Sequence, residues 1–183
     1  MADINVTTIK RQSGTAETSS ESAPAGQPMW EVIELLFFAY RDFVGDPDHV
    51  LAKLGFGRAH HRVLHFVNRN PGMKVADLLD ILRITKQSLG RVLKQLVDEG
   101  YVLQKEGDRD RRQRLLYVTE KGATLAMSLA QLQTERISRA LAEVGPSAPE
   151  AARRFLAAMI DPDSRSEVLG LIDQANKARQ QRT

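Results

Sequence analysis

The stretch from Arg83 to Gly122, RITKQSLGRVLKQLVDEGYVLQKEGDRDRRQRLLYVTEKG, decides the fold of this chain. Thr85 offers a hydroxyl that can cap the start of a helix, and Gly100 is a residue type that commonly follows a helix end. Between them, apolar side chains recur at helical spacing, at Leu89, Val92, Leu93, Leu96 and Val97. The pattern predicts a helix over Thr85–Asp98 with one buried face and one polar face.

A β-hairpin is predicted directly after this helix. Tyr101–Leu103 begin its first strand and Leu115–Val118 form the second, because aromatic and branched residues favour strands. The segment between them, EGDRDRRQR, is too polar to pack into a core. It carries four arginines, which are Arg109, Arg111, Arg112 and Arg114.

Positive charge is concentrated in this same stretch. Residues 83–114 hold nine basic and five acidic side chains, which gives +4 (nine minus five), against +3 for the whole chain. A basic helix face beside a basic hairpin tip suits a DNA duplex, with the helix in the major groove and the tip over the backbone or minor groove. The predicted DNA-binding residues are Thr85, Lys86, Gln87, Ser88, Arg91, Lys94, Asp110, Arg111, Arg112 and Arg114.

Two short helices are predicted before this stretch. Val63, Leu64 and Val67 give the first one, over Arg58–Asn68, its apolar stripe, and a turn at Pro71-Gly72 follows. The second is predicted over Val75–Leu82. Because only Arg83 and Ile84 separate it from the Thr85 helix, the pair predicts a helix-turn-helix, and the hairpin makes it winged.

The flanking helices carry more apolar surface than a small winged domain can cover. A helix over Met29–Val44 is apolar on nearly every side, is expected to break at Gly45–Pro47, and is followed by a short helical piece over Asp48–Leu54. Long helices are predicted over Glu120–Val144, over Pro149–Ile160, and from a Ser164–Glu167 capping box to Ala178. We expect these helices to form a dimerisation layer that a second subunit covers.

The fold class expected is therefore mainly α, with a small β-hairpin wing. The expected organisation is a disordered tail (residues 1–28), an N-terminal dimerisation helix and connector (29–54), a winged helix-turn-helix DNA-binding domain (55–118), C-terminal dimerisation helices (119–178) and a frayed end (179–183). The absence of cysteine excludes disulfides and thiolate metal sites. With no apolar run of about 20 residues and no secretory signal, we expect a cytoplasmic protein that does not enter the membrane.

The sequence resembles the MarR family of bacterial transcriptional regulators. The segments that carry the resemblance are HHRVLHFV, VADLLDILRITKQSLGRVLKQLVDEGYV and DRDRRQRLLYVTEKG, within Trp30–Ala175. The resemblance implies a homodimer on a pseudo-palindromic double-stranded DNA site, often with a small-molecule effector that loosens DNA binding. It also implies that Asp110 orients Arg112 and that Arg112 enters the minor groove. Arg83 is a departure, because the family often has glycine at this corner, so Arg83 either alters the corner or contacts phosphate.

Three histidines, His60, His61 and His65, fall on one short helix and leave several interpretations open. The spacing of His61 and His65 can hold a metal, but two nitrogens alone make a poor site, so no metal is assigned. The histidines are expected instead to line the interface or a ligand cleft between the winged domain and the dimer layer. The candidate ligand residues are Phe37, Tyr40, Arg41, His60 and His61.

No nucleophile motif, phosphate-binding glycine loop or convincing carboxylate pair is present, so no catalytic residue, enzyme activity or cofactor is predicted. The alternatives to a DNA-binding regulator are a winged module that binds a protein partner and a histidine-based metal sensor. The salt dependence of DNA binding and the sensitivity to chelators, respectively, separate them.

Overall fold

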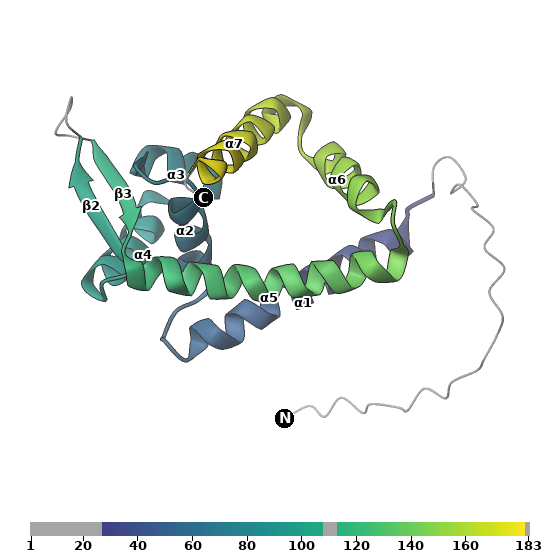
Figure 1. The fold of residues 1–183 in the computed structure, drawn as a ribbon, viewed down its shortest axis with the longest axis horizontal. Coiled ribbons are helices and arrows are strands. Elements are labelled where there is room, and N and C mark those ends of the chain that lie inside the picture. Colours follow the sequence, from purple (N-terminus) through teal and green to yellow (C-terminus); the bar gives the residue numbers. More distant parts are fainter. Residues whose placement is uncertain (1–26, 108–112, 182–183) are drawn as a thin grey trace.

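The fold is mainly helical with one small sheet, and the computed structural model describes residues 27–107 and 113–181 (Figure 1). The elements are α1 (Trp30–Ala52), α2 (Arg58–Arg69), β1 (Met73–Lys74), α3 (Val75–Leu82), α4 (Lys86–Asp98), β2 (Val102–Glu106), β3 (Arg114–Val118), α5 (Glu120–Val144), α6 (Ala148–Met159) and α7 (Pro162–Gln180). The predicted fold class, mainly α with a winged helix-turn-helix, is confirmed.

The main core lies inside the winged domain, where α2, α3, α4 and the sheet meet. Its fully buried side chains include Leu64 on α2, Leu78 on α3, Leu89 and Leu96 on α4, and Leu116 on β3. Burying each such leucine stabilises the fold by about 1.5–3 kcal/mol. The core therefore fixes which face of α4 points inward and which face is left for solvent.

The sheet has three antiparallel strands in the order β1-β3-β2. β2 and β3 form the predicted hairpin, with Val102 opposite Val118 and Glu106 opposite Arg114. The sequence did not predict β1, which pairs Met73 with Leu116. Two residues are too short for an alternating pattern, so only the tertiary pairing reveals this strand.

The predicted break at Gly45–Pro47 is wrong, because α1 continues through these residues to Ala52. A proline inside a helix removes one hydrogen bond and crowds the carbonyl four residues earlier. Packing outweighs this local cost: Val44, Pro47 and Leu51 are all buried. Asp46 also forms an ion pair with Arg136 of α5, with 2.9 Å between Oδ2 and Nη2.

The predicted capping box at Ser164 is also wrong. α7 begins at Pro162, and Asp161 caps it, because Oδ1 of Asp161 accepts a hydrogen bond from the N–H of Asp163 at 3.1 Å. Proline is well suited to the first helical position, where its missing N–H has no partner to lose. Of the apolar residues at helical spacing on this helix, which are Val168, Leu171, Ile172 and Ala175, only Ala175 is buried in the single chain.

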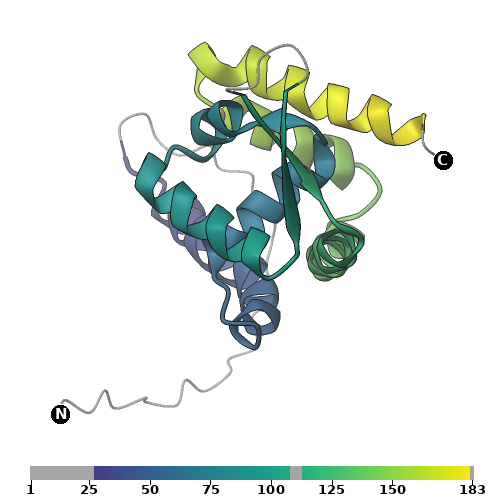
Figure 2. The same ribbon diagram turned by 90° about the vertical axis from the view of Figure 1, so that its left-hand side faces the viewer.

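The long helices extend away from the winged domain and then return to it. α1 and α5 run side by side, and α6 and α7 fold back so that α7 ends beside the winged domain (Figure 1). There, Arg69 at the end of α2 donates to Oδ1 of Asn176 at 2.6 Å. Figure 2 shows the winged-domain end of the molecule, with α4 and the strands facing the viewer, and so the surface expected to meet DNA.

Candidate nucleic-acid interface

Both ends of α4 are fixed by local hydrogen bonds. At the start, the hydroxyl of Thr85 accepts from the N–H of Ser88 at 3.1 Å, as predicted for the cap. At the end, Gly100 has a φ of 73°, its N–H donates to the carbonyl of Val97, and the N–H of Tyr101 donates to that of Leu96. This pair of bonds is the Schellman motif, which favours glycine because of the positive φ.

The outward face of α4 is open to a partner. Lys86, Gln87, Gly90, Arg91 and Lys94 are exposed and Ser88 is half-buried. With 13 residues the helix is about 20 Å long, and a helix of this kind fits the major groove of B-DNA. The structure therefore brings the predicted residues of α4 together on one face.

Two of the predicted cations already have partners in this structure. Lys94 pairs with Asp98 one turn later on α4, and Nη1 of Arg114 lies 2.9 Å from Oε1 of Glu106 on the neighbouring strand. Exposed pairs of this kind contribute about 0–1 kcal/mol, so a phosphate can displace the carboxylate. Within the described part of the chain, Lys86 and Arg91 form no ion pair.

The tip of the hairpin, which includes Asp110, Arg111 and Arg112, lies outside the described residues. The orienting role of Asp110 therefore stays a prediction from the resemblance. The described parts of the hairpin end at Gly107 and resume at Gln113, where the N–H of Gly107 donates to the carbonyl of Gln113 at 3.1 Å. A groove of about 800 Å³ lies between α3, α4 and this hairpin, and Lys86, Lys94 and Arg114 are among the residues that line it.

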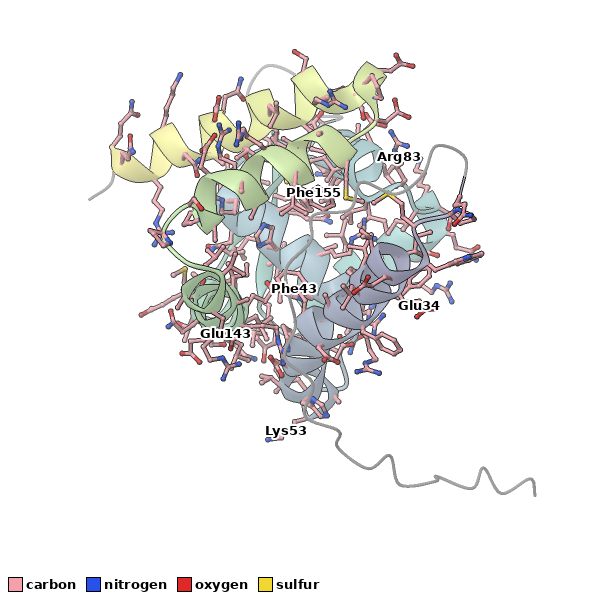
Figure 3. The ribbon with its side chains drawn as sticks, turned by 90° about the vertical axis from the view of Figure 1, so that its right-hand side faces the viewer. Glu34, Phe43, Lys53, Arg83, Glu143 and Phe155 are labelled. Carbon is pink, nitrogen blue, oxygen red and sulfur yellow. The ribbon has the colours of Figure 1, made fainter. Side chains whose placement is uncertain are left out.

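Arg83 explains why a glycine would suit the corner between α3 and α4. It has a φ of 49° and a ψ of 47°, the left-handed region, and it is the sole non-glycine residue with positive φ in the described ranges. Side chains with a Cβ adopt this region at a cost that glycine avoids. The corner is held from α2, because Arg62 donates to the carbonyl of Leu82 at 2.9 Å. The side chain of Arg83 is exposed beside the start of α4 (labelled in Figure 3).

The predicted ligand residues lie on two elements. Phe37, Tyr40 and Arg41 are exposed on α1, and Arg41 donates to Asp42 at 2.8 Å. On α2, the ring of His60 is hydrogen-bonded to Gln95 of α4. No hydrogen bond or ring contact in the described chain joins the three α1 residues to His60 or His61, so the ligand role stays a prediction.

His61 and His65 lie one turn apart on α2 and favour the neutral state. Burial lowers the pKa of His61 below 6.5, and nearby Asp48 partly opposes that shift. Desolvation also lowers the pKa of His65, with smaller contributions from His61 and Arg69. In residues 27–107 and 113–181 no three histidine, aspartate or glutamate side chains gather as metal ligands would.

The sequence profile of the MarR family matches residues 54–113. The HTH-type transcriptional regulator PetP of Rhodobacter capsulatus is 49% identical to this chain over 133 residues, which are 73% of this chain and 80% of PetP. The chain belongs to the MarR family. The resemblance seen in the sequence is therefore confirmed, and the protein is a MarR-type transcriptional regulator.

Several solved structures share the fold. A crystal structure of MarR matches with a TM-score of 0.60 and 18% identity, covering 80% of this chain and 98% of MarR. Streptococcus pneumoniae FabT, solved in complex with DNA, matches with a TM-score of 0.64 and 13% identity, covering 72% of this chain and 94% of FabT. A mutant MarR from E. coli complexed with operator DNA matches with a TM-score of 0.57 and 18% identity, covering 74% of this chain and all of that chain. None of the helices in the described ranges is long and apolar enough to cross a membrane.

Proposed function

We propose that this MarR-family protein regulates transcription as a homodimer that binds a pseudo-palindromic operator in double-stranded DNA. The observation that carries the proposal is the outward face of α4, where Lys86 and Arg91 are exposed without a carboxylate partner in the described chain. A rigid helix that presents polar side chains from a packed core can read base edges in the major groove. The DNA-bound FabT and mutant MarR, which share this fold, support duplex DNA as the partner.

The homodimer is supported by the apolar surface of α1. Trp30, Leu35, Phe37, Phe38 and Tyr40 have exposed fractions between 55% and 69% in the single chain. Soluble monomers rarely expose so many large apolar side chains on one helix.

A second apolar surface lies at the far end of the helical layer. Phe155, Leu156 and Met159 on α6 are each more than half exposed, and Val144 at the end of α5 is 76% exposed. Figure 3 looks at the end of the molecule where these helices lie, with Phe155 and Glu143 labelled. We infer that α1, α5 and α6 of a second copy cover these surfaces around a two-fold axis.

We further propose that a small effector binds where α1 meets α2, beside His61. Oδ2 of Asp48 lies 2.7 Å from Nε of Arg58, whereas Oδ1 of Asp48 is buried with no hydrogen-bond partner. A buried acceptor without a partner costs free energy. An effector would reach it only by opening the contact between α1 and α2, and its N–H or O–H group would then supply the missing donor. A compound that raises the melting temperature of the full chain but not of Asp48→Asn would identify this site.

Selection from a randomised duplex pool tests the DNA-binding proposal. The full chain should retain duplexes that share two half-sites in inverted orientation, because each subunit of a two-fold dimer meets one half-site. Retention without any shared sequence would contradict operator recognition. A winged module that binds a protein partner would retain no duplex at moderate salt.

A further inference from the structure

The backbone of His60 belongs to α2, and its ring contacts α4. The N–H of Gly57 lies 3.1 Å from Nδ1 of the ring, and Nε2 lies 2.9 Å from Oε1 of Gln95, which is 35 residues later in the chain. Since Nδ1 accepts a hydrogen bond from a backbone N–H, the ring proton sits on Nε2 and is donated to Gln95. The ring therefore caps the start of α2 and links it to the last turn of α4.

The ring of His60 is held in one orientation by its neighbours. It stacks on Phe56, with 4.7 Å between ring centroids and 11° between the planes. Phe56 is itself buried and meets the edge of Tyr101, just after the end of α4, at 5.1 Å. Because these neighbours hold the ring in one orientation, the side chain of His60 loses little conformational entropy when its hydrogen bond to Gln95 forms.

Gln95 belongs to the edge of the face that we expect to read DNA. Ser88, Arg91, Val92 and Gln95 follow one another at helical spacing, and together with His60 they line a hollow of about 350 Å³. The amide of Gln95 also donates to Oε1 of Glu99 at 2.9 Å. His60 and Gln95 thus line the same hollow as Arg91.

We propose that His60 is a positioning residue for sequence recognition, which it supports by fixing α4 through Gln95. This inference rests on the proposed DNA-binding function. Contacts between a side chain and a base edge demand accurate placement of the helix, whereas contacts with phosphates tolerate small shifts. The hydrophobic contacts of the buried leucines hold α4 against the core but are not directional. The hydrogen bond from His60 is directional, and it restrains α4 one turn after Arg91.

Substitutions at His60 separate its two hydrogen bonds. In His60→Gln, the side-chain amide can replace the Nε2 donor to Gln95 but cannot cap Gly57. In His60→Asn, the side-chain oxygen can replace the Nδ1 acceptor for Gly57 but cannot reach Gln95. The readout is the ratio of affinities for a duplex enriched from a randomised pool and for a scrambled duplex of equal length.

We expect His60→Asn and His60→Ala to lower that ratio by about tenfold, because each of the two subunits loses one hydrogen bond of moderate strength that positions α4. His60→Gln should keep the ratio near that of the wild type. Gln95→Ala should lower the ratio as His60→Ala does, and the double variant should lose no more than either single variant, because the two residues act through one bond.

Each other outcome overturns the proposal. If the variants lower the melting temperature while the ratio stays constant, His60 has a structural role only. If His60→Gln behaves like His60→Ala, the bond to Gln95 is not the restraint that matters. If the wild type enriches no sequence from the pool, the proposed operator recognition fails first and the positioning role falls with it.

Discussion

Among single residues, Arg91 and Lys94 separate sequence reading from general attraction to DNA. Arg91 is exposed without a carboxylate partner in the described chain, and it is the sixth of the 13 residues of α4, on the outward face that we expect to reach base edges. Arg91→Ala should therefore cost about 1–3 kcal/mol per half-site and relax sequence preference. Lys94 lies further along the helix, paired with Asp98, so Lys94→Ala should weaken binding to all sequences alike. Fluorescence anisotropy with enriched and scrambled duplexes measures the affinity of each variant for each duplex. Equal losses on both duplexes for Arg91→Ala would show that it does not read bases.

Arg83 offers a second residue-scale test, because strain and charge can be separated there. Its left-handed backbone should cost about 1 kcal/mol relative to glycine. Arg83→Gly should therefore raise the melting temperature by about 2–4 °C, whereas the matched control Arg83→Ala should not. Both variants remove the same charge, so both should weaken DNA binding equally if Arg83 contacts phosphate. A melting temperature that Arg83→Gly leaves unchanged would show that the corner is not strained.

At the scale of elements, the junction of the sheet with α5 depends on Gly122. A Cβ added there would lie 2.0 Å from the carbonyl oxygen of Tyr101, which accepts from the N–H of Thr119 at 3.0 Å. Gly122→Ala should therefore destabilise the protein by about 3 kcal/mol or more. Gly90→Ala is the matched control, because no atom lies within 4 Å of an added Cβ on that exposed helix position, and alanine should stabilise α4 by about 0.5–1 kcal/mol. Urea unfolding of the two variants measures the difference.

A pH-dependent stability belongs to α2, because its folded state holds two histidines with lowered pKa. The folded pKa of His61 and of His65 lies below the unfolded value of 6.5, so the unfolded chain binds more protons. The contribution of each histidine to stability is therefore complete above about pH 7 and is lost as the pH falls through 6.5 toward the folded pKa. Unfolding curves measured from about pH 8 to about pH 5 should show this loss of stability in the wild type. The loss should be smaller in His61→Gln and in His65→Gln. An identical slope in all three proteins would contradict it.

Elements with their own end signals could be predicted from the sequence, and those set by packing could not. The cap at Thr85 and the glycine at Gly100 bounded α4 correctly, and the helix predicted over Glu120–Val144 matches α5. The continuity of α1 through Pro47 could not be predicted, because it depends on burial against other elements. The link from His60 to Gln95 was missed for the same reason, since nothing in the spacing of two polar residues 35 positions apart signals a contact.

For the whole molecule, the proposed function requires two copies that act together on DNA. The apolar surfaces of α1 and α6 predict a dimer, and Phe37, which is 69% exposed, lies in the larger of them. Phe37→Glu should produce monomers, because it would bury a charge in the interface, whereas Phe37→Leu should leave the dimer intact. Sedimentation of the two variants measures whether each is a monomer or a dimer.

DNA binding should follow the state of assembly. A dimer presents two copies of the α4 face, which together should make on the order of 6–10 phosphate contacts, so affinity should fall about 10³–10⁵-fold between about 50 and 200 mM salt. The two helices should lie in successive major grooves, with half-sites about 34 Å apart. Phe37→Glu retains every DNA-facing residue, yet as a monomer it should show roughly half the slope of log affinity against log salt, because it makes half the contacts. If Phe37→Glu is monomeric but binds the enriched duplex with the full slope, one copy accounts for recognition and the proposed dimer on a two-fold operator is wrong.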